Sequence, residues 1–243
     1  MDDVLRLCVW SSPRNVSTAL MYSFAQRPDT RVIDEPLYGH YLRVSGAAHP
    51  IPVDVIASME SDGRKVISDV ILGPCDRPTL FMKQMTHHLV DIDLSFLAKT
   101  TNVLLTRDPV EMLPSLDGVL DKPTLRDTGF KGQADLLAVL REYGQEPPVL
   151  DSRELLRDPA GVLATFCGRL GMSFDDRMLR WAAGPRPEDG VWAPHWYANV
   201  HRSTGFQPYR PKAEPFPTHL EPLLAECQPY YDTLLELAIK AGD

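Results

Sequence analysis

Residues 11–18 form a candidate binding site for an anion. The stretch reads SSPRNVST and joins an apolar run directly to a pattern with helical spacing. Backbone N–H groups at the start of a helix, together with the helix dipole, attract negative charge. Arg14 would add a forked, charged donor, and Ser17 and Thr18 would add hydroxyl groups. Taken alone, the stretch favours a capped helix with a surface arginine, and it lacks the glycine-lysine pattern of ATP-hydrolysing loops.

A second candidate anion site follows the apolar stretch 102–106. Arg107 comes directly after this stretch, and Ser115 follows eight residues later. In a helix this spacing brings the serine to nearly the same face as the first turn, ~10 Å further along the axis. A phosphate beside the start of the helix could therefore contact both side chains. Alternatively, Arg107 pairs with Asp108 or Glu111, and Ser115 is incidental.

Several further side chains could neutralise charge or accept a proton. Lys83 lies inside the apolar run 79–85, which favours a paired or functional role over an edge-strand lysine facing water. Glu35 follows a short apolar stretch, and His87 and His88 follow the lysine in KQMTHHL. The ordinary pKa of histidine, about 6.5, suits a general base, whereas Glu35 would need its pKa raised by burial. The alternatives are a charge at a helix N-terminus for Glu35 and loop hydrogen bonds for the histidines.

Alternating strands and helices must position these side chains. Apolar runs bounded by turn residues predict strands, and helical spacing predicts helices. The predicted strands lie at residues 5–10, 31–33, 79–85, 102–106 and 148–150. The predicted helices lie at residues 17–26, 109–120, 159–170, 174–183 and 220–240. This order is typical of an α/β fold, a three-layer sandwich whose mainly parallel central sheet is covered by helices on both faces.

The candidate residues follow the carboxyl ends of predicted strands, where parallel sheets bind their ligands. We expect residues 1–243 to form one domain. Within it, residues 40–78 would be an inserted segment that covers the site as a lid or acceptor pocket. The segment 185–217, where prolines are concentrated, would be a long ordered loop.

Composition limits the partners of the chain. Its 243 residues are 44% hydrophobic and 24% charged, with a formal net charge of −8, as in an ordinary soluble domain. This charge argues against nucleic acid or an anionic membrane as the main partner, and no apolar run is long enough to span a membrane. Four scattered cysteines without CxxC spacing favour a reducing cytoplasm. No residue spacing is typical of a metal site.

Taken together, the two anion-site stretches resemble the PAPS-dependent sulfotransferase family. Its members have a P-loop-like fold and use 3′-phosphoadenosine 5′-phosphosulfate (PAPS) as the donor. The family's 5′-phosphosulfate loop, PRSGST or PRSGTT in many tyrosylprotein and bacterial members, corresponds here to Pro13, Arg14, Asn15, Val16, Ser17 and Thr18. The family's 3′-phosphate element is an arginine after a strand with a serine eight residues on, which matches Arg107 and Ser115.

Three later stretches, 151–159, 167–175 and 201–206, resemble later family segments in the same order. Two departures stand out. Val16 replaces the loop glycine, so the turn must be made differently or lie away from positive φ. Ser152 takes the place of a tyrosine that contacts adenine in the family. The adenine would then need another aromatic platform, for which the candidates are Trp10, Trp192, Trp196 and Phe206.

The resemblance implies roles for the candidate residues. The loop at 13–18, together with Arg107 and Ser115, would bind PAPS. A C-terminal loop within 185–217 would close over it with Ser203, Thr204 and Gly205. Arg14 and Lys83 would neutralise the charge that grows on the bridging oxygen as the sulfuryl group leaves 3′,5′-adenosine bisphosphate (PAP), the product.

The proton acceptor and the acceptor pocket are also implied by the resemblance. Glu35 resembles the glutamate base of the tyrosylprotein-type branch. We place it ahead of His87 and His88, which resemble the histidine base of cytosolic members with the spacing off by two. The pocket for a small-molecule hydroxyl or amine acceptor would be lined by Tyr38, His40, Tyr41 and His88. The first three of these residues are equally typical of a half-buried lid. The family implies no metal.

Two other functions remain open. A non-catalytic protein that binds PAP or PAPS would keep Arg14, Arg107 and Ser115 without a working base. A P-loop small-molecule kinase is disfavoured by the missing glycine-lysine pattern and by the missing acidic pair that would hold magnesium. The identity of the acceptor and the oligomeric state do not follow from the sequence.

Overall fold

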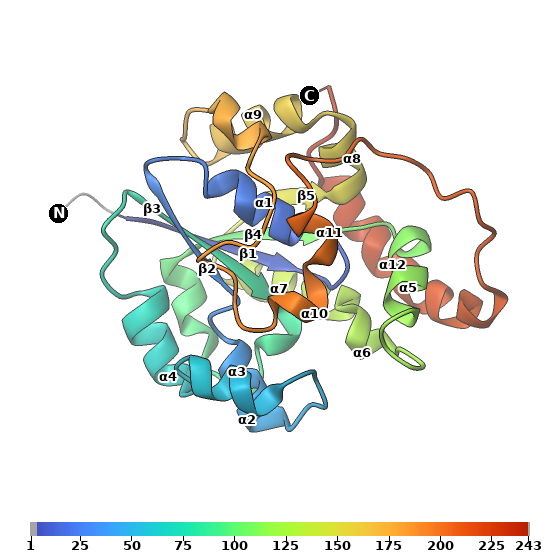
Figure 1. Ribbon diagram of the computed structural model, residues 1–243, viewed down its shortest axis with the longest axis horizontal. Coiled ribbons are helices and arrows are strands. Elements are labelled where there is room, and N and C mark those ends of the chain that lie inside the picture. Colours follow the sequence, from blue (N-terminus) through green and yellow to red (C-terminus); the bar gives the residue numbers. More distant parts are fainter. Residues whose placement is uncertain (1–3, 243) are drawn as a thin grey trace.

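The computed structural model describes residues 4–242. Five strands form one sheet in the order β2-β3-β1-β4-β5, and every neighbouring pair is parallel (Figure 1). The strands are β1 (Leu5–Ser11), β2 (Thr30–Asp34), β3 (Thr79–Met85), β4 (Thr101–Thr106) and β5 (Val149–Asp151). All five predicted strands are confirmed, and so is the parallel sheet.

Strand β1 lies at the centre of the sheet, and its register brings the ends of three strands together. Ser11 pairs with Met85 of β3 on one side and with Leu105 of β4 on the other. Strand β2 extends the sheet beyond β3, where Asp34 pairs with Lys83. The loops that follow β1, β2, β3 and β4 therefore leave the same edge of the sheet.

Alternate residues of each strand face opposite layers, as the two-residue period of a strand requires. Leu7 and Val9 pack in one core with α1 (Ser17–Phe24), α8 (Ser152–Arg157) and α9 (Pro159–Arg169). Cys8 and Trp10 pack in the other core with η1 (Val66–Ile71), η3 (Leu94–Lys99), α7 (Phe130–Glu142) and α12 (Glu221–Leu237). Both faces of the sheet are thus covered, and the predicted three-layer sandwich is confirmed.

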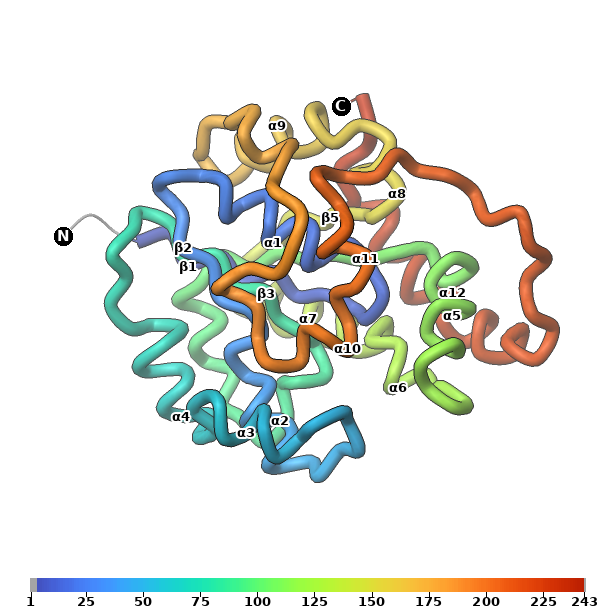
Figure 2. Tube along the Cα trace, viewed as in Figure 1, coloured from blue at the N-terminus to red at the C-terminus, as the bar shows by residue number. Residues whose placement is uncertain are grey.

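Several shorter elements complete the fold. They are α2 (Tyr38–Ser45), α3 (Pro52–Ser58), α4 (Gly63–Lys65), η2 (Thr86–His88), α5 (Pro109–Asp117), α6 (Leu125–Thr128), α10 (Ala193–Trp196), α11 (Ala198–His201) and η5 (Thr218–Leu220). Figure 2 shows the chain running from α9 across the front of the sheet to α10 and α11, then along an outer path to α12. None of the helices within residues 4–242 is both long and apolar enough to cross a membrane.

Two sequence-based expectations about helices differ from the structure. The predicted helix at 174–183 is wrong, since only the single turn η4 (Asp176–Leu179) forms there. After this turn the backbone pairs with a distant segment instead: Arg180 forms a bridge with Gly205, and the N–H of Trp181 donates to the carbonyl of Thr204. Helix α7, in contrast, was not among the predicted elements.

Candidate active site

The loop between β1 and α1 is held in place by the side chain of Asn15. Its Nδ2 donates to the carbonyl oxygen of Leu105 on β4 at 3.1 Å, and its Oδ1 accepts the backbone N–H of Ser17 at 2.9 Å. The second bond gives a partner to the N–H of Ser17, the first residue of α1, which has none within the helix. Asn15 thus ties the start of α1 to the end of a neighbouring strand.

Arg14 joins this loop to the one that follows β4. Its Nε donates to Oγ of Ser115 at 3.0 Å, and its carbonyl oxygen accepts from Nη1 of Arg107 at 2.8 Å. The backbone of Arg14 has φ 57°, a conformation that non-glycine residues rarely adopt. Burial, together with the nearby charge of Arg107, lowers the pKa of Arg14, so the guanidinium sits in a site that lacks a compensating anion.

Val16 shows how the loop forms without the family glycine. Its φ is −90°, an ordinary value for valine, and the strained left-handed position lies two residues earlier, at Arg14. The side chain of Val16 packs against the core beneath α1. The valine is therefore accommodated because the turn that would require a glycine is made elsewhere.

A second group of side chains gathers where β2 and β3 end. Nζ of Lys83 donates to Asp34 Oδ1 at 2.8 Å, to Glu35 Oε1 at 2.6 Å and to the hydroxyl of Tyr197 at 2.6 Å. The Tyr197 hydroxyl in turn donates to Asp34 Oδ2 at 2.6 Å and accepts from Nε1 of Trp192 at 3.1 Å. Lys83 is thus a buried, paired lysine and does not face water at a sheet edge.

Electrostatics in this cluster follow from its burial. Burial raises the pKa of Glu35, the Lys83 ammonium opposes that rise, and the charge of Asp34 adds to it. Burial alone would lower the pKa of Lys83, but Asp34 and Glu35 outweigh this effect and raise it, so the lysine stays charged. Burial and the Asp34 carboxylate raise the pKa of Tyr197, which keeps its proton.

The two histidines lie beside this cluster as neutral rings. The His88 ring stacks between Tyr38 and Tyr41, with centroids 5.0 Å and 4.9 Å away. Burial lowers the pKa of His87 to about 4, and burial together with His87 lowers that of His88 well below its ordinary value. Among the residues that the structure describes, the buried Nδ1 atoms of both histidines have no hydrogen-bond partner.

One cavity of about 640 Å³ joins the anion loop and the carboxylate–lysine cluster. The sequence-predicted site residues that line it are Pro13, Arg14, Asn15, Ser17, Thr18, Glu35, Tyr38, Tyr41, Lys83, His87 and His88. Its remaining wall includes Ala47, His49, Met85, Leu116, Val119, Leu120, Trp192, Trp196 and Tyr197. A ligand in this cavity can therefore contact the cationic loop and the free edge of Glu35 together.

Some predicted site residues do not line this cavity. Arg107 and Ser115 do not line the cavity themselves, but both form hydrogen bonds with Arg14, which does. His40 contacts the carbonyl of Val90 through Nε2 at 2.8 Å and lies under Gly63 of α4. Two more predicted groups also lie outside it: the core residue Val16, and the run Ser203, Thr204 and Gly205. In that run, Ser203 Oγ accepts from Nε1 of Trp181 and donates to the carbonyl of Val200.

The aromatic candidates for the adenine platform also differ in placement. Trp10 is fully buried, and its Nε1 donates to Asn102 at 2.9 Å, so it cannot stack on a ligand. Trp192 and Trp196 line the cavity. Phe206 packs edge-on against Trp181, with ring centroids 5.2 Å apart.

The predicted site residues do not include Asp34, His49, Tyr197 or Lys212. Asp34 lies next to the predicted Glu35, and a pair of acids after a strand could have indicated it. His49 lies in the 40–78 segment, while Tyr197 comes from 185–217, and no local pattern connects either residue with the site. The pKa of Lys212 is lowered by partial burial and by the nearby charge of Arg107. Lys212 belongs to a second cavity, which also contains Glu111.

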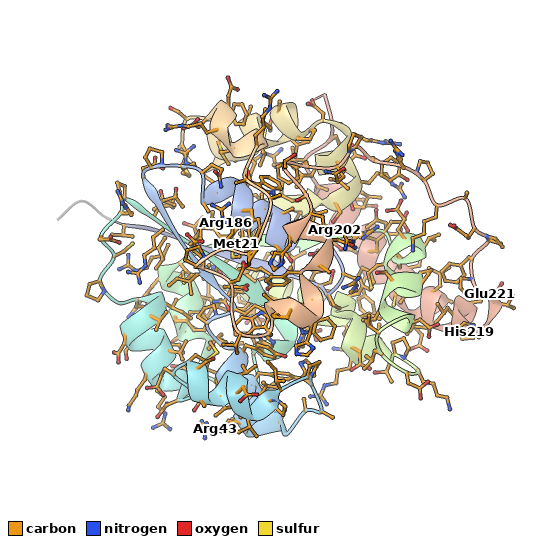
Figure 3. The ribbon with its side chains drawn as sticks, viewed as in Figure 1. Met21, Arg43, Arg186, Arg202, His219 and Glu221 are labelled. Carbon is orange, nitrogen blue, oxygen red and sulfur yellow. The ribbon has the colours of Figure 1, made fainter. Side chains whose placement is uncertain are left out.

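The segment 185–217 is attached to α1 as well as to Lys83. The Tyr22 hydroxyl donates to the carboxylate of Asp189 at 2.7 Å, and Nε2 of His201 contacts the same carboxylate at 2.9 Å. The guanidinium of Arg186 lies over the Tyr22 ring at 5.0 Å. Figure 3 labels Arg186 and Met21 over α1 in this view, and Arg202, which follows the last residue of α11. Within residues 4–242, no group of three or more His, Cys, Asp or Glu side chains could hold a metal ion.

Comparisons with known proteins agree with this architecture. A model of the sulfotransferase domain family matches residues 5–238. Two curated proteins of Arabidopsis thaliana, the branched-chain-amino-acid aminotransferase-like proteins 2 and 1, are 38% and 39% identical over 226 residues, or 93% of this chain. The chain spans 40% of the length of each of these relatives.

Solved structures show the same fold at low sequence identity. A sulfotransferase from Alicyclobacillus acidocaldarius is 14% identical, with a TM-score of 0.56 over 96% of this chain and 95% of that one. The sulfotransferase domain of the Synechococcus PCC 7002 olefin synthase is 18% identical, with a TM-score of 0.54 over 92% of this chain and 94% of that domain. The predicted sulfotransferase fold is thereby confirmed.

Proposed function

Since the chain belongs to the sulfotransferase domain family, we propose that it transfers a sulfuryl group from PAPS to a hydroxyl or amine of a small-molecule acceptor. One observation carries this proposal. A single cavity holds both a cationic loop at a helix N-terminus and a buried carboxylate with a free oxygen. The first suits the phosphosulfate of a donor, and the second suits the proton of an acceptor.

The donor would lie with its 5′-phosphosulfate against the 12–18 loop. Backbone N–H groups at the start of α1 and the guanidinium of Arg14 would then stabilise the negative charge that the leaving phosphate gains. The 3′-phosphate would lie near Arg107, Ser115 and Lys212, where burial and the charge of Arg107 lower the pKa values of Arg14 and Lys212, and where Glu111 is the acid paired with Arg107. A doubly charged phosphate group would relieve the repulsion between these cations.

Glu35 is the favoured base over His87 and His88. Its raised pKa makes it a stronger base than an ordinary glutamate, whereas the lowered pKa values of both histidines make them weaker bases. The neutral histidines would instead form part of the wall against which the acceptor lies. The direct role expected for Lys83 on the bridging oxygen stays a prediction. Such a contact would require it to give up one of its three present acceptors.

Radiolabelled transfer tests the proposal. Purified protein is incubated with ³⁵S-labelled PAPS and a mixture of hydroxyl and amine metabolites, and labelled organic sulfate is separated from inorganic sulfate. We expect labelled product, with a rate that falls ~10²–10⁴-fold in Glu35→Gln, as for loss of a general base. PAP should raise the melting temperature of both proteins alike.

Two outcomes would overturn this assignment. Stabilisation by PAP without transfer to any acceptor would identify a binding protein. Stabilisation by ATP with none by PAP would favour a kinase-type site. Glu60→Gln is the matched control. Glu60 belongs to the 40–78 segment but does not line the cavity, so this variant should transfer sulfate at the wild-type rate.

A further inference from the structure

We propose that Asp34 sets the basicity of Glu35, because both carboxylates share the single ammonium of Lys83. This inference rests on the proposed function, in which Glu35 takes the acceptor's proton. It assigns Asp34 as a positioning and tuning residue that does not touch either substrate.

The two carboxylates differ in how completely they are bonded. Both oxygens of Asp34 are occupied, Oδ1 by Lys83 at 2.8 Å and Oδ2 by the Tyr197 hydroxyl at 2.6 Å. Its side chain is 1% exposed, and it does not line the cavity. Asp34 is therefore enclosed by protein groups, and charge-assisted hydrogen bonds hold both of its oxygens.

Glu35 is bonded on one side only. Its Oε1 accepts from Lys83 at 2.6 Å, whereas Oε2 accepts no hydrogen bond from any residue that the structure describes. The side chain is 12% exposed and lines the cavity. The backbone of Glu35 has φ 43°, and its N–H still donates to the carbonyl of Lys83 at 2.9 Å, so the strained turn is fixed to β3.

The charges around Glu35 come from Lys83 and Asp34. Five groups face the carboxylate: Lys83, Asp34, Tyr197, Tyr38 and His88. Burial raises the pKa of both tyrosines and lowers that of the histidine, so these three are neutral. One ammonium then faces two carboxylates, which leaves a net negative charge in a buried site.

Such a site binds a proton more readily than an isolated ion pair does. Because Asp34 has a full set of donors, the added proton goes to Glu35. In the transfer step, the acceptor's O–H proton moves to Oε2 of Glu35 as the acceptor oxygen bonds to sulfur. The bond between sulfur and the bridging oxygen breaks, and its electron pair stays on the phosphate of PAP. The shared lysine thus favours the ionised form of Glu35 before the step, and burial together with Asp34 makes that carboxylate a stronger proton acceptor.

A direct titration tests the charge relationship without reference to activity. Protein labelled with ¹³C at glutamate carboxyl carbons is titrated by NMR, and the Glu35 signal is assigned by its loss in Glu35→Gln. We expect the Glu35 pKa to fall in Asp34→Asn, because the lysine then serves one carboxylate. It should rise in Lys83→Met, because the opposing cation is gone. An Asp34→Asn value equal to the wild-type one would overturn the inference.

Kinetics supply the second readout. In Asp34→Asn the acidic limb of the kcat/KM profile should move to lower pH, and kcat should fall about tenfold, as for a weaker base. The control Asp76→Asn removes an exposed acid three residues before β3 and should leave the profile unchanged. PAP should stabilise both variants as it does the wild type, since neither residue lines the cavity.

A further variant covers the case in which Asp34→Asn does not fold. Asp34→Ser also removes the carboxylate that competes for Lys83 and keeps a hydroxyl as its acceptor, so the Glu35 pKa should fall as in Asp34→Asn. An unchanged or raised value would overturn the inference. The two proposals fail differently: shifted NMR titrations without transfer contradict the proposed function, whereas transfer with unshifted titrations contradicts the role of Asp34.

Discussion

Nε of Arg14 donates a hydrogen bond to Oγ of Ser115, 101 residues further along the chain, across 3.0 Å. Arg107 completes the link by donating to the carbonyl of Arg14. Each of the two loops is ambiguous by itself. A capped helix would account for the loop before α1, and an arginine paired with an acid of its own helix would account for the loop after β4. Together, the loops bring the side chains of Arg14, Arg107 and Ser115 close to the strained backbone of Arg14. Arg14 is therefore fixed from both its side chain and its backbone.

Arg107→Ala should weaken the binding of PAP by about 10–100-fold, as expected when a charge-assisted contact worth ~1.5–3 kcal/mol is lost. Binding of AMP, which has no 3′-phosphate, should weaken much less. Isothermal titration calorimetry with both nucleotides gives the two ratios. Arg169→Ala, at an exposed arginine of α9, serves as the control for loss of charge. Equal losses for PAP and AMP would mean that Arg107 acts on the loop alone and does not bind the 3′-phosphate.

The partly buried His87 should make the fold less stable in acid. Its pKa is about 4 in the folded protein because of burial, against about 6.5 in an unfolded chain. Below pH 6.5 the unfolded chain thus gains a proton that the folded one does not. The free energy of unfolding should decrease as pH falls from about 6.5 to about 4, by ~3 kcal/mol from this residue at most. Above pH 6.5 the residue should contribute no pH dependence.

Urea unfolding between pH 4.5 and 7.5 measures this effect. The slope of the unfolding free energy against pH reports how many protons the chain takes up on unfolding. Near pH 5 it should be smaller in His87→Gln than in the wild type, by the equivalent of up to one bound proton. His195→Gln, at an exposed histidine, should keep the wild-type slope. An unchanged slope in His87→Gln would show that this ring accepts a proton without unfolding.

Replacing Val16 by the family's glycine should destabilise the protein. The valine has an ordinary φ and packs on the core, so glycine would add freedom to the unfolded chain and remove buried surface. We expect a loss of ~1–2 kcal/mol in urea unfolding, with PAP affinity nearly unchanged. Val191→Gly, at an exposed position, should lose much less. An increase in stability would indicate strain at Val16 that its dihedral angles do not show.

The fold was predictable because its strands are short, apolar and bounded by turn residues. Strand β3 illustrates this, since all seven of its residues are buried, as its apolar run predicted. The stretch 174–183 was assigned wrongly because its helical spacing competes with long-range pairing. Arg180 and Gly205 form a bridge that no local pattern contains.

The site was predictable where its residues lie next to strand ends and was not where they come from distant segments. Glu35 and Lys83 follow from β2 and β3, and the register of these strands brings them together. Tyr197 lies 114 residues after Lys83, and its contact with Nζ depends on how the 185–217 segment packs. The placement of His40 shows the reverse error. Its helical spacing with Tyr38 and Tyr41 suggested a shared face, but its ring is turned toward the carbonyl of Val90.

The segment from Asp189 to Tyr197 is anchored at both of these residues, one bonded to Tyr22 of α1 and the other to Lys83 of β3. Trp192 and Trp196 lie between these anchors and line the cavity, so this part of the cavity wall is held at both ends. A change at Asp189 or at Tyr197 would therefore reach both the tryptophan wall of the cavity and, through Tyr197, the lysine that Glu35 shares with Asp34.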